Sequence, residues 1–285
     1  MGADRANPRS PNALFWLGED VMPSRRLMLQ CALPLLWTVV AQAESGPSQD
    51  TWTGLKPMFF GDRTIDEAPG YVALEAPKRA EDAALVPIDL KFPRRETGDR
   101  VVAATVIVDE NPSPLATTLR RGALDGAFDF GLRLRVNSYS YVRVIAETET
   151  GALHMAKAFV KAAGGCSAPA SKDPEEATAN LGKMKFRSFA GQGMAEAQAM
   201  IRHPNYSGMQ MDQITRLYTP AWYVTQVAVR QGDRLLFSLE NGISLSEDPT
   251  FRFTYAANGQ PVRIEAKDSK GADYAQTFSA DGAAY

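Results

Sequence analysis

Short strands that recur at hairpin spacing constrain the fold of this chain more than any other feature. The clearest lies at 128–136, where every second residue is apolar and the residues between them are charged or small. A period of two places the apolar side chains on one face of a strand. No long stretch of helical periodicity interrupts the series, so the pattern predicts an all-β protein built as β-sandwiches.

The other predicted strands fall in two groups separated by a polar stretch. Turn residues separate the strands within each group. One segment, 194–201, is predicted as a helical turn. The first group comprises 86–92, 101–108, 139–146 and 153–160, and the second comprises 184–187, 222–229, 234–239, 250–255, 262–266 and 274–278.

The chain length suits two domains of ordinary size, since 285 residues allow each of them to bury a core. We predict a lead-in at 44–65, a first sandwich at 66–163, an arm and linker at 164–180, and a second sandwich at 181–285. The linker is rich in Gly, Pro, Ser and Ala and has almost nothing apolar to bury, which favours a flexible, solvated connection.

The N-terminal region has the features of an export signal. A pair of arginines, Arg25 and Arg26, precedes an apolar run at 27–40 and an Ala-Gln-Ala site, which predicts cleavage after Ala43. The run is shorter than the roughly 20 residues of a membrane-spanning helix. We expect Sec-type export to the periplasm and no membrane attachment after cleavage. Met22 is an alternative start, which would make 1–21 an over-extended gene model.

A single cysteine, Cys166, is left in the mature chain, because Cys31 lies in the predicted signal. In an oxidising compartment a single cysteine indicates intermolecular pairing or a reactive thiol. Gly164 and Gly165 precede it and favour a mobile arm, on which an exposed thiol could carry a cargo. The alternative is a buried, inert thiol. Its nearest cations in sequence, Lys161 and Lys172, are not adjacent to it, so nothing local lowers its pKa.

Other chemistry-bearing residues give weaker signals. His154 and His203 fall in different domains without a cysteine cluster, so a structural role is favoured over a metal site. Asp109 and Glu110 are interpreted as a solvated or turn-forming pair. A thiol oxidoreductase would need a resolving cysteine, and no catalytic triad, phosphate loop or haem-attachment motif is found. We therefore predict a protein that is not an enzyme and has no cofactor. The net charge of −2 gives no reason to expect nucleic acid as a partner.

The order of several short motifs, together with the position of the thiol, resembles the SoxYZ sulfur-carrier proteins, fused into one polypeptide. The resemblance covers about 66–278 and no single motif in it is decisive. In the first half it lies in VDENPSPLA at 108–116, LRLR at 132–135 and the strand ending in Gly-Gly-Cys at 164–166, and in the second half in IRHP at 201–204, TPAWYV at 219–224 and DPTFRF at 248–253.

The resemblance implies two immunoglobulin-like sandwiches and a cysteine that carries a covalent sulfur adduct in thiosulfate oxidation. Only Cys166 and its two glycines match the family's arm, so the role is carried over to them alone. The chain departs from the family pattern, in which the arm is a free C-terminus ending Gly-Gly-Cys-Gly-Gly. Here Ser167 and Ala168 follow the cysteine and the chain continues into the second domain. This fused arrangement is similar to a quinoprotein dehydrogenase-associated SoxYZ-like carrier.

Two hypotheses follow. In the first, Cys166 is a periplasmic carrier that presents a thiol-bound sulfur cargo to sulfur-oxidation enzymes. In the second, the protein is an accessory docking module for a periplasmic PQQ-dependent (quinoprotein) dehydrogenase and its cytochrome, and Cys166 is incidental. A third, a metal-binding sandwich that uses His154 and His203, is weaker.

Overall fold

The structure is a computed structural model that describes residues 49–67, 69–97, 99–122, 126–171, 174–189, 194–212 and 215–280. All described residues belong to one compact unit. The predicted signal, the cleavage site after Ala43, the alternative start at Met22 and Cys31 all lie outside the described residues. Among the described helices, none has the length and apolar character needed to cross a bilayer.

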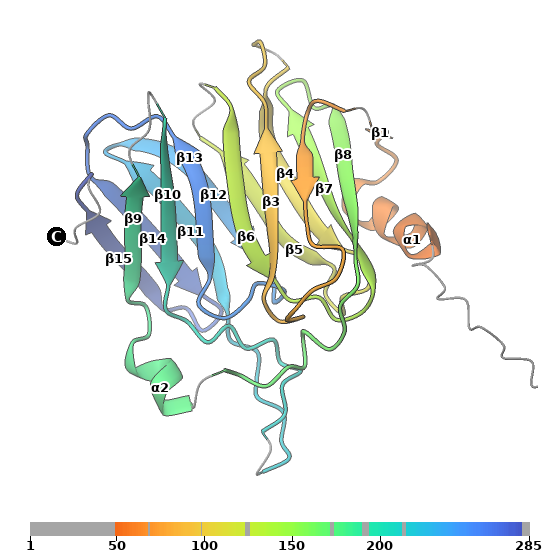
Figure 1. The fold of residues 1–285 in the computed structure, drawn as a ribbon, viewed down its shortest axis with the longest axis vertical. Helices are drawn as coiled ribbons and strands as arrows, with labels where there is room; N and C mark the ends of the chain where they lie inside the picture. The colour runs from red at the N-terminus through yellow and green to blue at the C-terminus, as the bar shows by residue number, and fades with distance from the viewer. Residues whose placement is uncertain are drawn as a thin grey trace, which may run out of the picture. The chain divides into compact units, whose positions relative to one another are not determined.

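Strands dominate the described residues, with one helix at the N-terminal end and a short one between the two halves (Figure 1). The elements are α1 (Gln49–Phe60), β1 (Ile65–Asp66), β2 (Ala73–Glu75), β3 (Val86–Phe92), β4 (Val101–Val108), β5 (Leu115–Arg121), β6 (Phe128–Leu134), β7 (Ser140–Thr148), β8 (Leu153–Val160), α2 (Pro174–Ala179), β9 (Met184–Phe189), β10 (Ala195–Ile201), β11 (Val224–Gln231), β12 (Arg234–Asn241), β13 (Thr250–Tyr255), β14 (Val262–Asp268) and β15 (Asp273–Phe278).

The strands form two facing sheets, each of which runs through both halves of the chain (Figure 1). The nine-stranded sheet has the order β1-β8-β7-β4-β5-β12-β11-β14-β15, and the six-stranded sheet has the order β2-β3-β6-β13-β10-β9. The halves meet where β5 pairs with β12 and β6 pairs with β13, both antiparallel. Main-chain hydrogen bonds therefore join the two sandwiches edge to edge.

One hydrophobic core fills the space between the sheets and includes side chains from both halves. At the junction, the ring of Phe237 from β12 lies edge-on to that of Phe130 from β6, with centroids 5.3 Å apart. Phe251 from β13 packs against the same Phe130 ring at 6.0 Å. Buried aromatic pairs of this kind stabilise a fold beyond the area that they bury. The sequence-predicted all-β sandwich architecture is confirmed.

The strand predictions hold at 86–92, 101–108, 153–160 and 250–255, which are β3, β4, β8 and β13 with the same bounds. The predicted helical turn at 194–201 is wrong, because Ala195–Ile201 is strand β10. Strand β10 pairs with β9 on one side and with β13 on the other. Its alternate residues, among them Ala197 and Ala199, are buried in the core. Ala, Gln, Glu and Met favour helix locally, but pairing on both sides of the strand overrides that preference.

Helix α1 was not predicted, because 44–65 was interpreted only as a lead-in to the first sandwich. Leu55 in α1 is buried in a small apolar cluster with residues from the nine-stranded sheet, including Ile107 and Ile145. The helix therefore covers part of the outer face of that sheet. Strand β5 was also missed, and the predicted linker contains helix α2.

Candidate functional site

The thiol lies on the segment that follows β8. Residues 161–171, called the arm below, cross the lower end of the sandwich toward α2 (Figure 1). The main-chain N–H of Gly164 donates to the carbonyl of Asn137 at 2.8 Å, and that of Gly165 donates to the carbonyl of Val136 at 3.1 Å. The arm is therefore hydrogen-bonded to the connection between β6 and β7.

Cys166 is buried, with only 1% of its surface exposed. The sequence predicted an exposed and mobile thiol, and the structure contradicts that expectation of exposure. The reason is tertiary, because small flanking residues that suggest mobility in a sequence also allow the main chain to pack closely. Whether the two glycines act as a flexible arm stays a prediction.

Gly165 permits the close packing. A Cβ atom at this position would overlap the carbonyl oxygen of Ala83 and lie 2.6 Å from that of Val136. Real Cβ atoms do not approach oxygen so closely, so only glycine fits without a shift of the main chain. The same carbonyl of Ala83 accepts a hydrogen bond from the N–H of Val136 at 2.8 Å. The arm therefore packs directly on a part of the backbone that is itself hydrogen-bonded.

The second half of the chain holds the arm from the other side. We call residues 203–210 the clasp. Ser207 Oγ in the clasp donates to the carbonyl of Cys166, and Gln210 Nε2 donates to the carbonyl of Ala168 at 3.1 Å. Beyond the clasp, the carboxylate of Glu247 accepts from the main-chain N–H of Ser171 at 3.1 Å and from its hydroxyl. Sequence reasoning identified neither the clasp nor Glu247.

The guanidinium of Arg135 is fully buried next to the arm. Its Nη1 donates to the carbonyl of Gly165 at 3.2 Å and its Nη2 to the carbonyl of Asn205 at 3.4 Å, while its Nε has no hydrogen-bond partner. Burial lowers the pKa of Arg135, because removal from water disfavours its charge. The sequence analysis placed this residue on the polar face of a strand, and its only signal was its position between the apolar residues 134 and 136.

Burial also raises the pKa of the Cys166 thiol to about 11, and the positive charge of Arg135 only partly opposes this. The thiol is therefore neutral at pH 7 in this conformation. A neutral thiol is a poor nucleophile, because the thiolate is the reactive form. The arm as seen here protects the cysteine from reaction rather than presenting it.

A second buried arginine lies elsewhere and has a different environment. Arg143 from β7 is paired with Asp109, whose two carboxylate oxygens lie 2.9 and 2.8 Å from its Nε. Both side chains are closed to solvent. Asp109 lies in the turn that follows β4, as predicted, but it is not solvated, because Arg143 binds its carboxylate in the interior. Glu110, its neighbour, is half-buried and accepts a hydrogen bond from Thr51.

The two histidines lie in separate places. His203 is buried at the start of the clasp, where its Nδ1 accepts from the N–H of Asn205 at 3.1 Å and its Nε2 lies 3.6 Å from Asp268. His154 is buried in β8, stacked on the ring of Tyr71 with centroids 3.4 Å apart. The structure does not bring them together. Among the described residues, no group of three His, Cys, Asp or Glu side chains is arranged to hold a metal ion.

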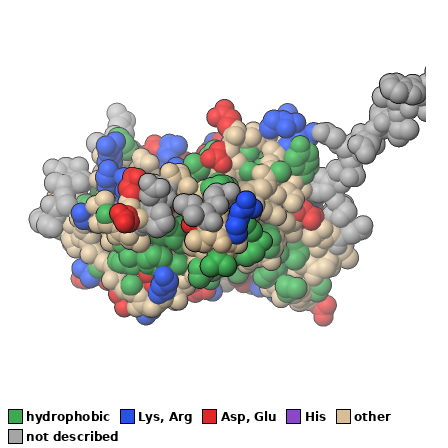
Figure 2. All heavy atoms as spheres, turned by 90° about the horizontal axis from the view of Figure 1, so that it is seen from below, with side chains coloured by type: hydrophobic (Ala, Val, Ile, Leu, Met, Phe, Trp, Pro, Cys, Tyr) green, Lys and Arg blue, Asp and Glu red, His purple; other side chains and the backbone are tan. Residues whose placement is uncertain are grey.

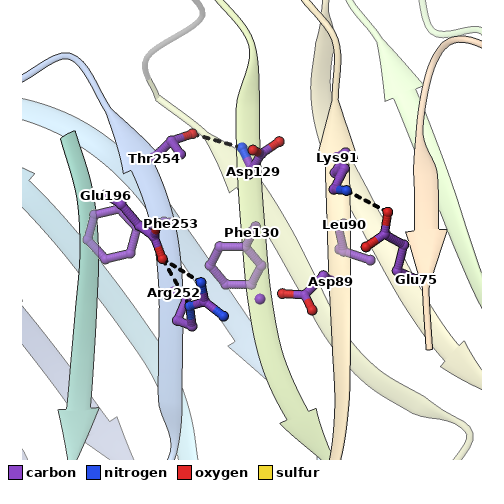
Figure 3. Close-up of a pocket in the computed structure, with 11 residues that line it drawn as sticks. Glu75, Asp89, Leu90, Lys91, Asp129, Phe130, Glu196, Arg252, Phe253 and Thr254 are labelled. Carbon is purple, nitrogen blue, oxygen red and sulfur yellow. Dashed lines mark hydrogen bonds and ion pairs between the residues drawn. The ribbon is translucent and has the colours of Figure 1, made fainter. Parts of the chain in front are cut away.

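A shallow cavity of about 230 Å³ lies on the outer face of the six-stranded sheet (Figure 3). Gly131 is part of its lining, and the strand residues paired with that glycine on either side are Asp89 and Arg252. Arg252 is paired with Glu196, with 2.5 Å from Nη2 to Oε1. Most charges here neutralise one another at the surface, and the cavity has neither a thiol nor an imidazole in its lining. It therefore carries no candidate chemistry.

The face that carries the arm exposes apolar side chains (Figure 2). Two of the most exposed large apolar residues, Leu217 and Tyr218, are 69% and 64% exposed and lie in the connection that continues from the clasp to β11. Tyr139, in the connection between β6 and β7, is also exposed. Exposed apolar side chains thus lie on the two connections that adjoin the arm.

Comparison with known families matches both halves of the chain. Residues 56–166 match the model for sulfur oxidation protein SoxY, and residues 185–279 match the model for sulphur oxidation protein SoxZ. The first match ends at the buried cysteine. No curated protein matches the chain significantly.

Proposed function

Because this chain belongs to the SoxYZ family, with its SoxY and SoxZ parts fused into one polypeptide, we propose that it is a carrier that holds a sulfur-containing cargo on Cys166. The SoxY and SoxZ domains are those of non-catalytic carrier proteins of sulfur oxidation, which interact with sulfur-oxidation enzymes. The cargo, its attachment to this cysteine and a periplasmic location are our proposals.

One observation carries the assignment to Cys166. It is the only cysteine among the described residues, and it is the last residue of the SoxY match. The arm around it is held at the junction between the SoxY-like and SoxZ-like halves, by Gly165 on one side and Ser207 on the other. A carrier needs a thiol on a segment that can be sheltered in one state and presented in another, and these contacts supply the sheltered state.

Loading is an oxidation. A bond from Cys166 to the sulfur atom of a nucleophilic cargo such as thiosulfate releases the thiol proton and two electrons. We propose that a partner enzyme accepts these electrons, and that it also draws the arm out of the fold, since the buried thiol is neutral. Release of the arm breaks the side-chain hydrogen bonds that it receives from Arg135, Ser207 and Gln210 and those that it donates to Glu247.

The buried thiol is also the observation that favours the alternative, a docking module in which Cys166 is incidental. The exposed Leu217 and Tyr218 would suit such docking as well as they suit a carrier's encounter with its enzymes. The quinoprotein dehydrogenase as partner rests on the sequence resemblance alone.

Intact mass of the protein isolated from its own cells tests the proposal. We expect a sulfur-containing adduct on the wild-type chain that disappears on reduction, and none on Cys166→Ser, whose hydroxyl preserves the shape of the site. A wild-type thiol that stays unmodified while the cells oxidise sulfur compounds would instead support the docking module. The same samples, fractionated into periplasm and cytoplasm, test the location and the cleavage after Ala43.

A further inference from the structure

We propose that Arg135 is the residue that recognises the cargo on Cys166, by binding the negative charge of an anionic sulfur adduct. This inference rests on the proposed function. It concerns the residue that recognises the charge of the cargo.

The argument begins with a buried charge that lacks a counter-ion. Among the described residues, no carboxylate lies within ion-pair distance of the Arg135 guanidinium, which donates only to the main-chain carbonyls of Gly165 and Asn205. Its Nε is buried and has no partner. Neutral carbonyls do not replace an anion, and a buried guanidinium without one is strongly disfavoured.

The other fully buried arginine shows how this fold compensates such a charge. Arg143 is as buried as Arg135, but it faces the carboxylate of Asp109. Each arginine thus sits in a comparable interior, and only the one beside the thiol is left without a carboxylate. This contrast indicates that the counter-ion of Arg135 is an anionic group of a bound molecule and not a side chain of the protein.

Protein groups near Arg135 do not supply the anion. The Cys166 thiol is neutral at pH 7 in its buried state. Asp82 and Glu247 act on the charge of the guanidinium only through space, without a hydrogen bond to it. Asp82 instead accepts a hydrogen bond from the main chain of Ala84, and Glu247 accepts one from Ser171. Cys166 directly follows Gly165, whose carbonyl already accepts a hydrogen bond from Arg135. A charged group attached to the sulfur of Cys166 would therefore be close to the guanidinium.

Arg135 is suited to this role by its geometry. A guanidinium donates in parallel to two oxygens of a planar or tetrahedral oxyanion, and such charge-assisted bonds are stronger than those to neutral carbonyls. A sulfonate oxygen would replace the carbonyls of Gly165 and Asn205 as acceptor. The bonds from Ser207 and Gln210 to the arm are single side-chain contacts that can yield to make room for the cargo.

Adducts of different charge on the same thiol test the inference. In the full chain with Cys31→Ser, Cys166 is the only cysteine. Methanethiosulfonate reagents that carry an ethylsulfonate, a hydroxyethyl or an ethyltrimethylammonium group each form a mixed disulfide with this thiol and release methanesulfinic acid. Labelling is followed to completion by intact mass, and the melting temperature of each adduct is then measured.

We expect the sulfonate adduct to melt highest and the ammonium adduct lowest, with a gap of at least about 4 °C. Because the charges meet in the interior, the gap should persist in 0.5 M salt, which screens surface pairs. Arg135→Gln should abolish the gap, Arg135→Lys should retain part of it, and Arg133→Gln, a neighbouring arginine that binds Thr250, should leave it unchanged.

Equal melting temperatures for the three adducts of the wild-type chain would overturn the inference, and this comparison needs no Arg135 variant that folds. A gap that survives Arg135→Gln would overturn it as well. Neither result depends on the adduct found in cells, so the proposed carrier function can stand while the role of Arg135 fails. Conversely, a cellular protein without cargo would remove the function but not the measured preference for an anion.

Discussion

The guanidinium of Arg143 and the carboxylate of Asp109 face each other in the interior, with Arg143 Nε 2.9 and 2.8 Å from the two carboxylate oxygens. The Trp52 ring from α1 lies against the guanidinium, 4.5 Å from its central carbon. The pair thus joins the turn between β4 and β5 to β7, under the helix that packs on the outer face of the sheet.

Asp109→Ala should destabilise the protein by about 3–5 kcal/mol, because it leaves a buried guanidinium without its counter-ion. Urea unfolding measures the loss. The surface substitution Lys91→Ala, which removes an exposed pair with Glu75, is the control and should cost less than about 1 kcal/mol. The double substitution Asp109→Leu with Arg143→Met should be less costly than Asp109→Ala. If it is more costly, the pair contributes stability of its own.

Gly165→Ala should expose the thiol. The added methyl group overlaps the carbonyl of Ala83, so the arm has to leave its place. We expect Cys166 to react with a disulfide reagent such as DTNB at least about tenfold faster than in the wild type, which corresponds to about 1.4 kcal/mol of lost closure. Gly54→Ala, where a Cβ would enter open space, is the matched control and should leave the rate unchanged. An unchanged rate in Gly165→Ala would show that the arm opens independently of this contact.

Asp268 should make the protein sensitive to acid. Burial acts to raise its pKa, but hydrogen bonds from Trp222, Tyr274 and two main-chain N–H groups outweigh burial and lower the pKa to about 2. The folded pKa is below the ordinary value of 3.8, so the stabilisation is present above about pH 4 and is lost as the pH falls toward 2. It amounts to roughly 2 kcal/mol.

Urea unfolding between pH 7 and 2 checks this, and Asp268→Asn should show a shallower loss below pH 4. His203 acts in an earlier window. Burial lowers its pKa below 6.5, so its contribution to stability declines as the pH falls below 6.5. His203→Gln should reduce the loss of stability just below pH 6.5 and leave the loss below pH 4 unchanged. If the free energy of unfolding falls equally with pH below 4 in Asp268→Asn and in the wild type, groups other than Asp268 cause the acid sensitivity.

The two halves should unfold together, because they share both sheets and one core. Calorimetry is expected to give a single transition whose calorimetric and van't Hoff enthalpies agree. Phe237→Ala, at the junction, should cost about 3–5 kcal/mol and reduce hydrogen-exchange protection in both halves. Leu55→Ala, in the separate cluster under α1, should affect protection mainly near that helix. Two resolved transitions in the wild type would contradict the shared core.

Local pattern was sufficient for most of the strands. The alternation in β3 and β13 predicted their limits, because a period of two in a half-buried strand is written in consecutive residues. The pattern failed where local preference and tertiary pairing disagree. The Ala- and Gln-containing segment 195–201 favours helix locally and becomes β10 between β9 and β13. Helix α1 was missed although Trp52, Leu55 and Phe59 recur at helical spacing, because Gly54 and Pro57 within the segment disfavour a helix.

Residue patterns alone predicted that the protein is built of strands, that it resembles the SoxYZ carriers and that Cys166 is the thiol to examine. That this thiol is sheltered could be seen only in the folded chain. The contacts that shelter it come from Ala83, Arg135 and Ser207, residues far from Cys166 in the sequence. Periodicity reports on neighbours in the chain, whereas burial and the compensation of charge depend on groups that only folding brings together.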